Sequence, residues 1–91
     1  MAVKVRIPTP LRQLTKGIDI VELGGTNVGD LLTDLCGKFE GMDKRLFKQP
    51  GELNRFVNIY VNDEDIRFLD NLTTAVKDGD DVSIVPAIAG G

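Results

Sequence analysis

The fold is decided by the stretch NVGDLLTDLCGKF, residues 27–39. Its apolar side chains recur at intervals of three and four residues, which places them on one face of an α-helix. Thr26 or Asn27 can cap the first turn, and Asp30 adds a negative charge where the helix dipole favours one. We therefore expect one amphipathic helix over about residues 27–39. Its apolar face consists of Val28, Leu31, Leu32, Leu35 and Phe39.

Two strands are expected before this helix. Residues 2–7 alternate apolar and polar side chains, and the prolines at positions 8 and 10 end the run because proline cannot donate to a ladder. Residues 18–23 form a second apolar run, in which we expect Ile18 and Ile20 to share one face of the strand. The two runs are close in sequence, so they are predicted to pair as a hairpin.

Further strands are expected after the helix. Residues 56–61 give the strongest strand pattern in the chain, and residues 66–68 are predicted to form a short returning strand after the turn at 62–65. Residues 81–86 form the last strand. The segment 40–55 has no clear period, and we expect two residues to pin it to the body of the domain. These two residues are Leu46 and Phe47, and the inward residues of the strands are Val57, Ile59, Val61, Val82 and Ile84.

The element order is strand, strand, helix, strand, short strand, strand. The single apolar face of the helix must be buried, and a mixed sheet is the only surface available to cover it. This arrangement is the β-grasp, or ubiquitin-like, architecture of the α+β class, with one main helix packed across a mixed sheet. We predict one domain over residues 1–86 and a flexible C-terminal Gly-Gly tail over residues 87–91.

Composition excludes several kinds of function. The chain has one cysteine and no histidine, so it cannot form an internal disulfide, a Cys₄ zinc site, an iron–sulfur cluster or a Ser-His-Asp triad. The net charge of −3 comes without a basic stripe, which argues against a nucleic-acid partner. No apolar run approaches the roughly 18–20 residues that span a bilayer, and residues 1–7 lack a signal-peptide core. We therefore expect no membrane association and a cytoplasmic location.

The chain ends in Gly90-Gly91, and this ending carries the predicted chemistry. Glycine has no Cβ, so two terminal glycines form a bare backbone thread that fits a narrow active site. A partner that adenylates the Gly91 carboxylate would give it a leaving group. A sulfur nucleophile could then displace AMP and leave a thiocarboxylate on Gly91. The residues expected to thread into the partner's site are Ala87, Ile88, Ala89 and Gly90.

The sequence resembles the MoaD/ThiS family of ubiquitin-like sulfur carriers over essentially its whole length. The matching features are the opening VKVRIP at residues 3–8, the helix, and the last strand running into Ala89-Gly90-Gly91. The run RFVNIYVNDEDIRF, residues 55–68, followed by DGD at 78–80, most resembles the CysO branch, which serves cysteine synthesis. The resemblance implies that Gly91 carries the sulfur and that the chain is a protein cosubstrate without a catalytic residue of its own.

The resemblance also implies a set of partners. An E1-like adenylyltransferase/sulfurtransferase would use ATP to activate Gly91, while the carrier itself binds no cofactor. A PLP-dependent cysteine synthase would receive the sulfur, and a zinc metalloprotease would release the new cysteine. Three alternatives stay open: the small subunit of molybdopterin synthase, which acts with a larger catalytic subunit; a ubiquitin-like protein modifier; and a passive interaction module.

Four further features have competing interpretations. Phe56, Tyr60 and Phe68 could form a partner-binding face on the side of the sheet opposite the helix, or they could fill a second small core under the 40–55 segment. Cys36 is best interpreted as a small buried hydrophobe rather than as the sulfur-carrying group. The acidic turns at 63–65 and 78–81 lack the calcium-loop pattern, so we expect no metal site there.

Overall fold

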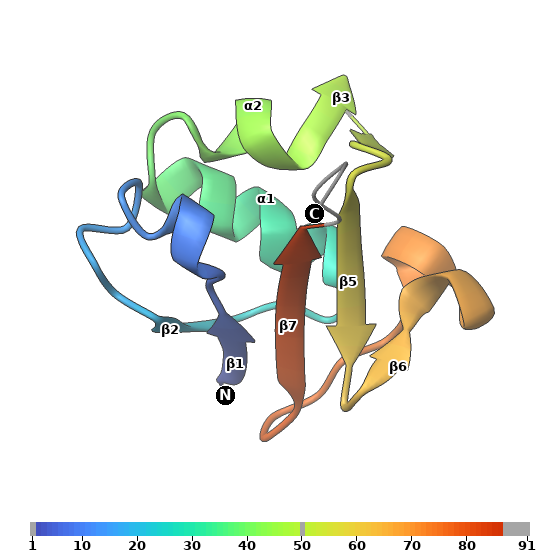
Figure 1. Cartoon of the computed structure of the whole chain (residues 1–91). Coiled ribbons are helices and arrows are strands. Elements are labelled where there is room, and N and C mark those ends of the chain that lie inside the picture. Colours follow the sequence, from blue (N-terminus) through green and yellow to red (C-terminus); the bar gives the residue numbers. More distant parts are fainter. Residues whose placement is uncertain (1, 50, 87–91) are drawn as a thin grey trace.

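The computed structural model describes residues 2–49 and 51–86 (Figure 1). A five-stranded mixed sheet has the order β2-β1-β7-β5-β6, and β3 pairs with β4 in a separate small hairpin. The strands of the main sheet are β1 (Val3–Arg6), β2 (Ile20–Leu23), β5 (Val57–Val61), β6 (Glu64–Asp65) and β7 (Asp81–Pro86). The other elements are α1 (Val28–Lys38), α2 (Met42–Leu46), β3 (Phe47–Gln49), β4 (Glu52–Leu53) and the 3₁₀ turns η1 (Thr9–Leu11), η2 (Ile66–Phe68) and η3 (Asn71–Thr73).

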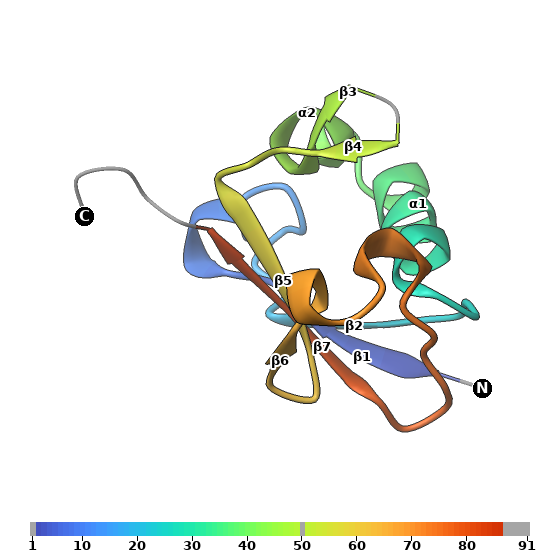
Figure 2. The ribbon, with the colours of Figure 1, turned by 90° about the vertical axis from the view of Figure 1, so that its right-hand side faces the viewer.

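The predicted β-grasp is confirmed. β1 and β2 form the antiparallel hairpin, β7 runs parallel to β1, and β5 pairs antiparallel with β7. Figure 2 shows α1, α2 and the β3–β4 hairpin on the same side of the sheet. Within residues 2–49 and 51–86, no helix is long and apolar enough to cross a membrane.

The helix forms where the sequence predicts it. Asn27 caps α1 by accepting a hydrogen bond from the Asp30 N–H at 2.8 Å, which satisfies one of the unpaired donors of the first turn. The apolar face is fully buried against the inward side chains of the sheet, while Phe39 ends the helix and is half-buried against the core. The fully buried residues of this face are Val28, Leu31, Leu32 and Leu35.

The second strand is shorter than the predicted 18–23, because β2 begins at Ile20 and Ile18 precedes it. Both isoleucines are exposed to solvent. They are 44% and 37% exposed, whereas Leu23 is buried. The reason is the register of the hairpin, which places Val21 opposite the buried Val5. Directly opposed residues of an antiparallel pair lie on the same side of a sheet, so Val21 and Leu23 face inward and Ile20 faces outward.

The predicted returning strand at residues 66–68 is wrong. Asn62 and Asp63 both adopt positive φ, 50° and 72°, as a two-residue type I′ hairpin requires, so the chain returns at once as β6. Residues 66–68 then form η2. Asp65 caps this turn by accepting the Arg67 N–H at 2.9 Å and the Arg67 guanidinium at 2.7 Å, and the side-chain bond lowers the pKa of Asp65.

The segment 40–55 contains structure that has no clear period in the sequence. It forms α2 and the β3–β4 hairpin, and Leu46 is fully buried while Phe47 packs against the core, as expected. Gly41 begins α2 with φ of 89°, a left-handed conformation that side chains with a Cβ rarely adopt. The segment therefore covers one side of α1 (Figure 2).

Two glycine substitutions test this description of α1 and α2. Gly37 lies inside α1, and a methyl group added there would meet no atom within 4 Å beyond its chain neighbours and the nearby helix backbone. Gly37→Ala should therefore stabilise the fold by about 0.5–1 kcal/mol through helix propensity. Gly41→Ala should instead destabilise it by roughly 1–2 kcal/mol, because an L-residue is strained at positive φ. Urea unfolding followed by circular dichroism measures both changes. The description of these two sites is wrong if the two substitutions shift stability in the same direction.

Candidate functional site

The strand that leads into the C-terminal residues lies in the middle of the sheet. β7 is paired on one side with β1, where Arg6 lies opposite Ser83, and on the other side with β5, where Val57 lies opposite Pro86. The residues predicted to carry and thread the sulfur, Ala87 to Gly91, lie outside the described residues. The structure therefore describes the base from which this segment starts, and that base is held by ladders on both sides.

The face of the sheet opposite α1 carries apolar side chains close to this base. Val85 points outward from β7, between the inward Ile84 and the last described residue, and is 41% exposed. Its neighbour across the ladder is Asn58, and Tyr60 lies opposite Ser83 on the same face. We call this surface the outer face. It consists of the outward residues Lys4, Arg6, Ile20, Glu22, Asn58, Tyr60, Asp81, Ser83 and Val85.

An ion pair crosses the outer face. The Arg6 guanidinium donates to both carboxylate oxygens of Asp81, with Nε–Oδ1 at 3.0 Å and Nη2–Oδ2 at 3.3 Å. Both side chains are about half exposed, so the pair adds little to stability. Ile20 lies opposite Arg6 in the β1–β2 ladder, and Tyr60 lies opposite Ser83 in the β5–β7 ladder. The ion pair therefore holds two charged groups between Ile20 and Tyr60.

The three aromatics predicted as a partner face do not form one surface. Tyr60 is half-buried on the outer face, and Phe56 lies just before β5 with 47% of its surface exposed. Phe68 is 85% exposed, but it belongs to η2, which lies beyond the β5–β6 margin of the sheet (Figure 1). Phe68 therefore does not belong to the predicted face, because it lies in the 3₁₀ turn η2 and not on a strand of the sheet.

Phe56 stands at the point where β7 ends. Val57 lies opposite Pro86, the last described residue, and Phe56 directly precedes Val57. The Phe56 N–H donates to the Asn54 Oδ1 at 3.0 Å, and the Arg55 guanidinium lies 5.1 Å from the centre of the Phe56 ring. This cation–π contact holds an exposed aromatic ring and a positive charge together near the end of β7.

Sequence reasoning missed Ile18, Ile20 and Val85 as exposed apolar residues near the outer face. The signal for Val85 is present in the sequence, because a strand with Val82 and Ile84 inward must turn Val85 outward. The signal for the two isoleucines is weaker. Residues 18–23 are apolar on both faces, so only the pairing with β1 determines which set is exposed.

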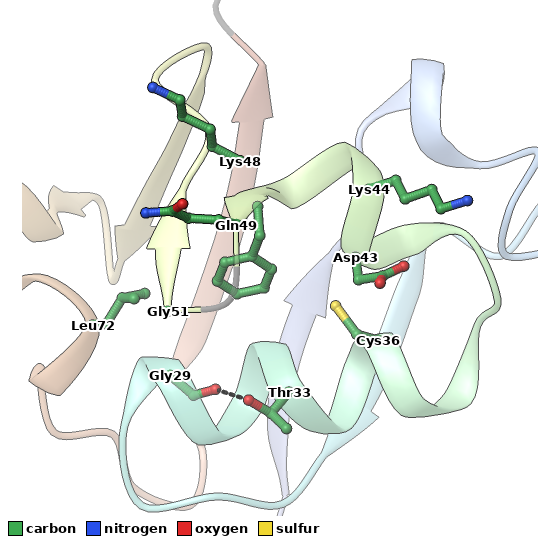
Figure 3. A pocket seen from close by; sticks show the side chains of 10 residues that line it. Gly29, Thr33, Cys36, Asp43, Lys44, Lys48, Gln49, Gly51 and Leu72 are labelled. Atoms are coloured by element: carbon green, nitrogen blue, oxygen red, sulfur yellow. Dashed lines mark hydrogen bonds between the residues drawn. The ribbon is translucent and has the colours of Figure 1, made fainter.

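Cys36 lies away from the outer face. It lines a hollow of about 500 Å³ between α1, α2, β3 and η3, where Figure 3 shows its sulfur pointing into the space beside Asp43. Burial, together with the nearby Asp43 carboxylate, raises the pKa of the Cys36 thiol to about 11. A thiol with this pKa is protonated at neutral pH and is a poor nucleophile. The geometry supports the interpretation of Cys36 as a partly buried packing residue.

The acidic turns hold no metal cluster in the part of the chain that the structure describes, where no three His, Cys, Asp or Glu side chains converge. The Asp80 carboxylate instead accepts the Lys77 N–H at 2.9 Å and the Asn62 side-chain amide at 3.1 Å. The Asp81 N–H donates to the Asn62 Oδ1 at 3.0 Å. These bonds tie the start of β7 to the end of β5, so the acidic groups serve the turns.

Comparison with known proteins gives a consistent result. The ThiS family model matches residues 5–91. The sulfur carrier protein CysO of Mycobacterium tuberculosis is 50% identical over 93 residues, covering all of both chains. The crystal structure of the Amycolatopsis orientalis BexX/CysO complex contains a chain with a TM-score of 0.92 and 48% identity, covering 99% of this chain and 100% of that one. Small archaeal modifier protein 3 of Haloferax volcanii is 41% identical over 64 residues, covering 70% of this chain and 68% of its own.

The position of Cys36 gives a prediction on thiol reactivity. Because the raised pKa keeps the thiol protonated, alkylation by iodoacetamide at pH 8 should be about a hundredfold slower than for a free thiol, and its rate should rise until the pH reaches about 11. Asp43→Asn should speed the reaction by removing one of the two causes. Asp34→Asn is the matched control on the same helix and should leave the rate unchanged. Alkylation at pH 8 as fast as that of an unfolded chain would contradict the described burial.

Proposed function

Because this chain belongs to the ThiS family, we propose that it is a sulfur carrier whose Gly91 carboxylate is the group that holds the sulfur. The observation that carries the proposal is the combination of full-length similarity to CysO with the terminal Gly90-Gly91. The sulfur carrier role follows from the family. The chemical steps, the partners and the receiving pathway are parts of the proposal.

The proposed chemistry uses two substitutions. A carboxylate oxygen of Gly91 attacks the α-phosphate of ATP in an activating enzyme, which releases pyrophosphate and forms an acyl adenylate. A sulfide nucleophile then attacks the Gly91 carbonyl carbon and expels AMP, which leaves a thiocarboxylate. Neither step needs a side chain of the carrier, in agreement with a sequence that contains no histidine.

The residues of the chain contribute by positioning. β7 is held by ladders on both sides, so the described end of this strand at Pro86 is a fixed base for a segment that must enter a partner's active site. We propose that Val85, Phe56 and Tyr60 contact the activating enzyme around the mouth of that site. Exposed apolar and aromatic groups next to a reactive segment suit this role, since such residues dominate interface energetics.

The proposed receiving pathway is cysteine synthesis, in which a PLP-dependent synthase takes the sulfur and a metalloprotease frees the product. Similarity to CysO favours this pathway over molybdopterin synthesis. A second function, conjugation of Gly91 to lysines of target proteins, is supported by the similarity to small archaeal modifier protein 3. The same activated carboxylate would serve both functions, and they differ in the nucleophile that attacks it.

Mass spectrometry of the chain from its native host tests the sulfur-carrying residue. Trypsin cuts after Lys77, and the C-terminal peptide 78–91 contains no methionine or cysteine. A thiocarboxylate adds about 16 Da, and in this peptide the same gain cannot come from oxidation of methionine or cysteine. We expect this mass shift on peptide 78–91, together with alkylation of the same peptide by iodoacetamide.

Deletion of Gly91 is the control and should abolish both signals. Recovery of Gly91 joined to lysine-containing peptides would establish the modifier function instead. If the tail peptide carries neither sulfur nor a conjugate when cells are starved of sulfur, the carrier proposal is wrong and the chain acts as a passive interaction module.

Substitutions of Val85 on the outer face, and of Phe56 just before β5, test the proposed contact with the activating enzyme. Val85→Lys and Phe56→Ala should each raise the KM for the carrier about tenfold in an adenylation assay, because both remove apolar contacts at the centre of the interface. Phe68→Ala is the matched control and should leave KM within about twofold, since η2 lies off this face. Equal effects of all three substitutions would show that the contact does not depend on the outer face.

A further inference from the structure

The outer edge of β2 offers unpaired backbone groups. β2 is the terminal strand of the sheet and pairs with β1 alone within residues 2–49 and 51–86. The Ile7 N–H donates to the Asp19 C=O at 2.7 Å. This bond shows that Asp19, Val21 and Leu23 direct their backbone groups toward β1. Because this pattern alternates along an antiparallel strand, Ile20 and Glu22 direct their N–H and C=O groups away from β1. Among the described residues, β2 has no second neighbouring strand, and no turn or loop bond reaches these four groups.

The charge beside this edge is mainly negative. On the neighbouring strand, Lys4 lies opposite Glu22, and Arg6 is paired with Asp81. Residues 17–37 contain four of the chain's 14 acidic residues and none of its 11 lysines and arginines. Glu22 lies on the edge strand, Asp19 directly precedes it, and both are exposed. Asp30 lies close to the end of β2, because the Thr26 hydroxyl donates to its Oδ2 at 3.1 Å, and Asp34 is one turn further along the same side of α1.

Exposed apolar groups accompany the charge. Ile20 is 37% exposed on the outer side of the edge, and Val21 is half-buried on the inner side. Ile18, two residues before β2, is 44% exposed. An added strand would therefore meet apolar contacts on both of its faces, as well as backbone donors and acceptors. These are the features that allow an extended peptide to add to a sheet.

The negative charge of this edge indicates which kind of strand can bind there. Two copies of this chain paired edge to edge would bring Asp19 and Glu22 of one copy beside the same residues of the other, and like charges on paired strands are destabilising. A strand with lysine or arginine between apolar residues would satisfy both the charge and the apolar contacts. We propose that the edge of β2 is a docking site for an extended, basic segment of a partner protein.

This site goes beyond the proposed carrier function because it uses residues 18–34 and not Gly91. In the sheet order, β1 separates β2 from β7, so an added strand would leave the tail-bearing strand and Val85 uncovered. A partner could then hold the carrier by β2 while the C-terminal residues enter an active site. The edge of β2 and the contact at Val85, Phe56 and Tyr60 can accordingly be occupied at the same time.

A titration of the ¹⁵N-labelled full chain with a blocked peptide of alternating lysine and valine tests the site. We expect amide shift changes concentrated at Ile20–Leu23, slower hydrogen exchange at the Ile20 and Glu22 amides, and weaker binding as salt is raised. A peptide of alternating glutamate and valine should cause no shifts. The proposal is overturned if the lysine peptide leaves residues 20–23 unchanged up to millimolar concentration.

Two charge-matched variants separate this edge from general attraction to acidic groups. The pair Asp19→Asn and Glu22→Gln should weaken binding of the lysine peptide about fivefold. The pair Asp63→Asn and Glu64→Gln, at the opposite margin of the sheet, should leave it unchanged. Equal losses in both pairs would overturn the proposal, as would concentration-dependent shifts at residues 20–23 without peptide, which would identify a second copy as the occupant. Since Gly91 takes no part, failure here would leave the carrier proposal intact.

Discussion

Burial of the apolar face of α1 is the constraint on which the rest of the structure depends. Val28, Leu31, Leu32 and Leu35 have no exposed surface, and burial of each such side chain contributes about 1.5–3 kcal/mol. A short helix cannot hide this face by itself, so it needs an apolar surface of similar size. The inward residues of the sheet supply it. They are Val3, Val5, Leu23, Ile59, Val61, Val82 and Ile84.

This constraint divides the sheet into two sides with different freedom. The inner side must stay apolar along every strand, which is why the predicted inward residues of β1, β5 and β7 agree with the structure. The outer side has no such demand and carries an ion pair, a tyrosine and isolated apolar groups. Partners can contact the outer side without disturbing the core. Because the core and the outer side use different residues, a small chain can keep its fold and still bind partners.

The sequence predicts elements whose period is clear and misses those that depend on pairing. The α1 face and the alternation in β7 are visible in the sequence because each has one apolar side. The orientation of Ile20 is not visible, because residues 18–23 are apolar on both sides and only the register with β1 decides. The position of Phe68 depends on positive φ at Asn62 and Asp63, which allows a turn of only two residues. The chain therefore returns early as β6, and Phe68 falls in η2. The short elements α2, β3 and β4 are stabilised by packing of Met42, Leu46, Phe47 and Leu53 in or against the core, and their own sequences carry no period.

The position of β7 in the sheet links the fold to the carrier role. A strand that leads to a reactive terminus must not be pulled from the sheet when a partner draws that terminus into its active site. A central strand is attached by two ladders, whereas an edge strand is attached by one, and here Asp80 and Asn62 also fasten the start of β7. Displacing β7 would expose Val82 and Ile84 and so uncover the face of α1. Packing of Val82 and Ile84 in the core therefore helps to keep β7 in the sheet while the C-terminal residues act in the proposed function.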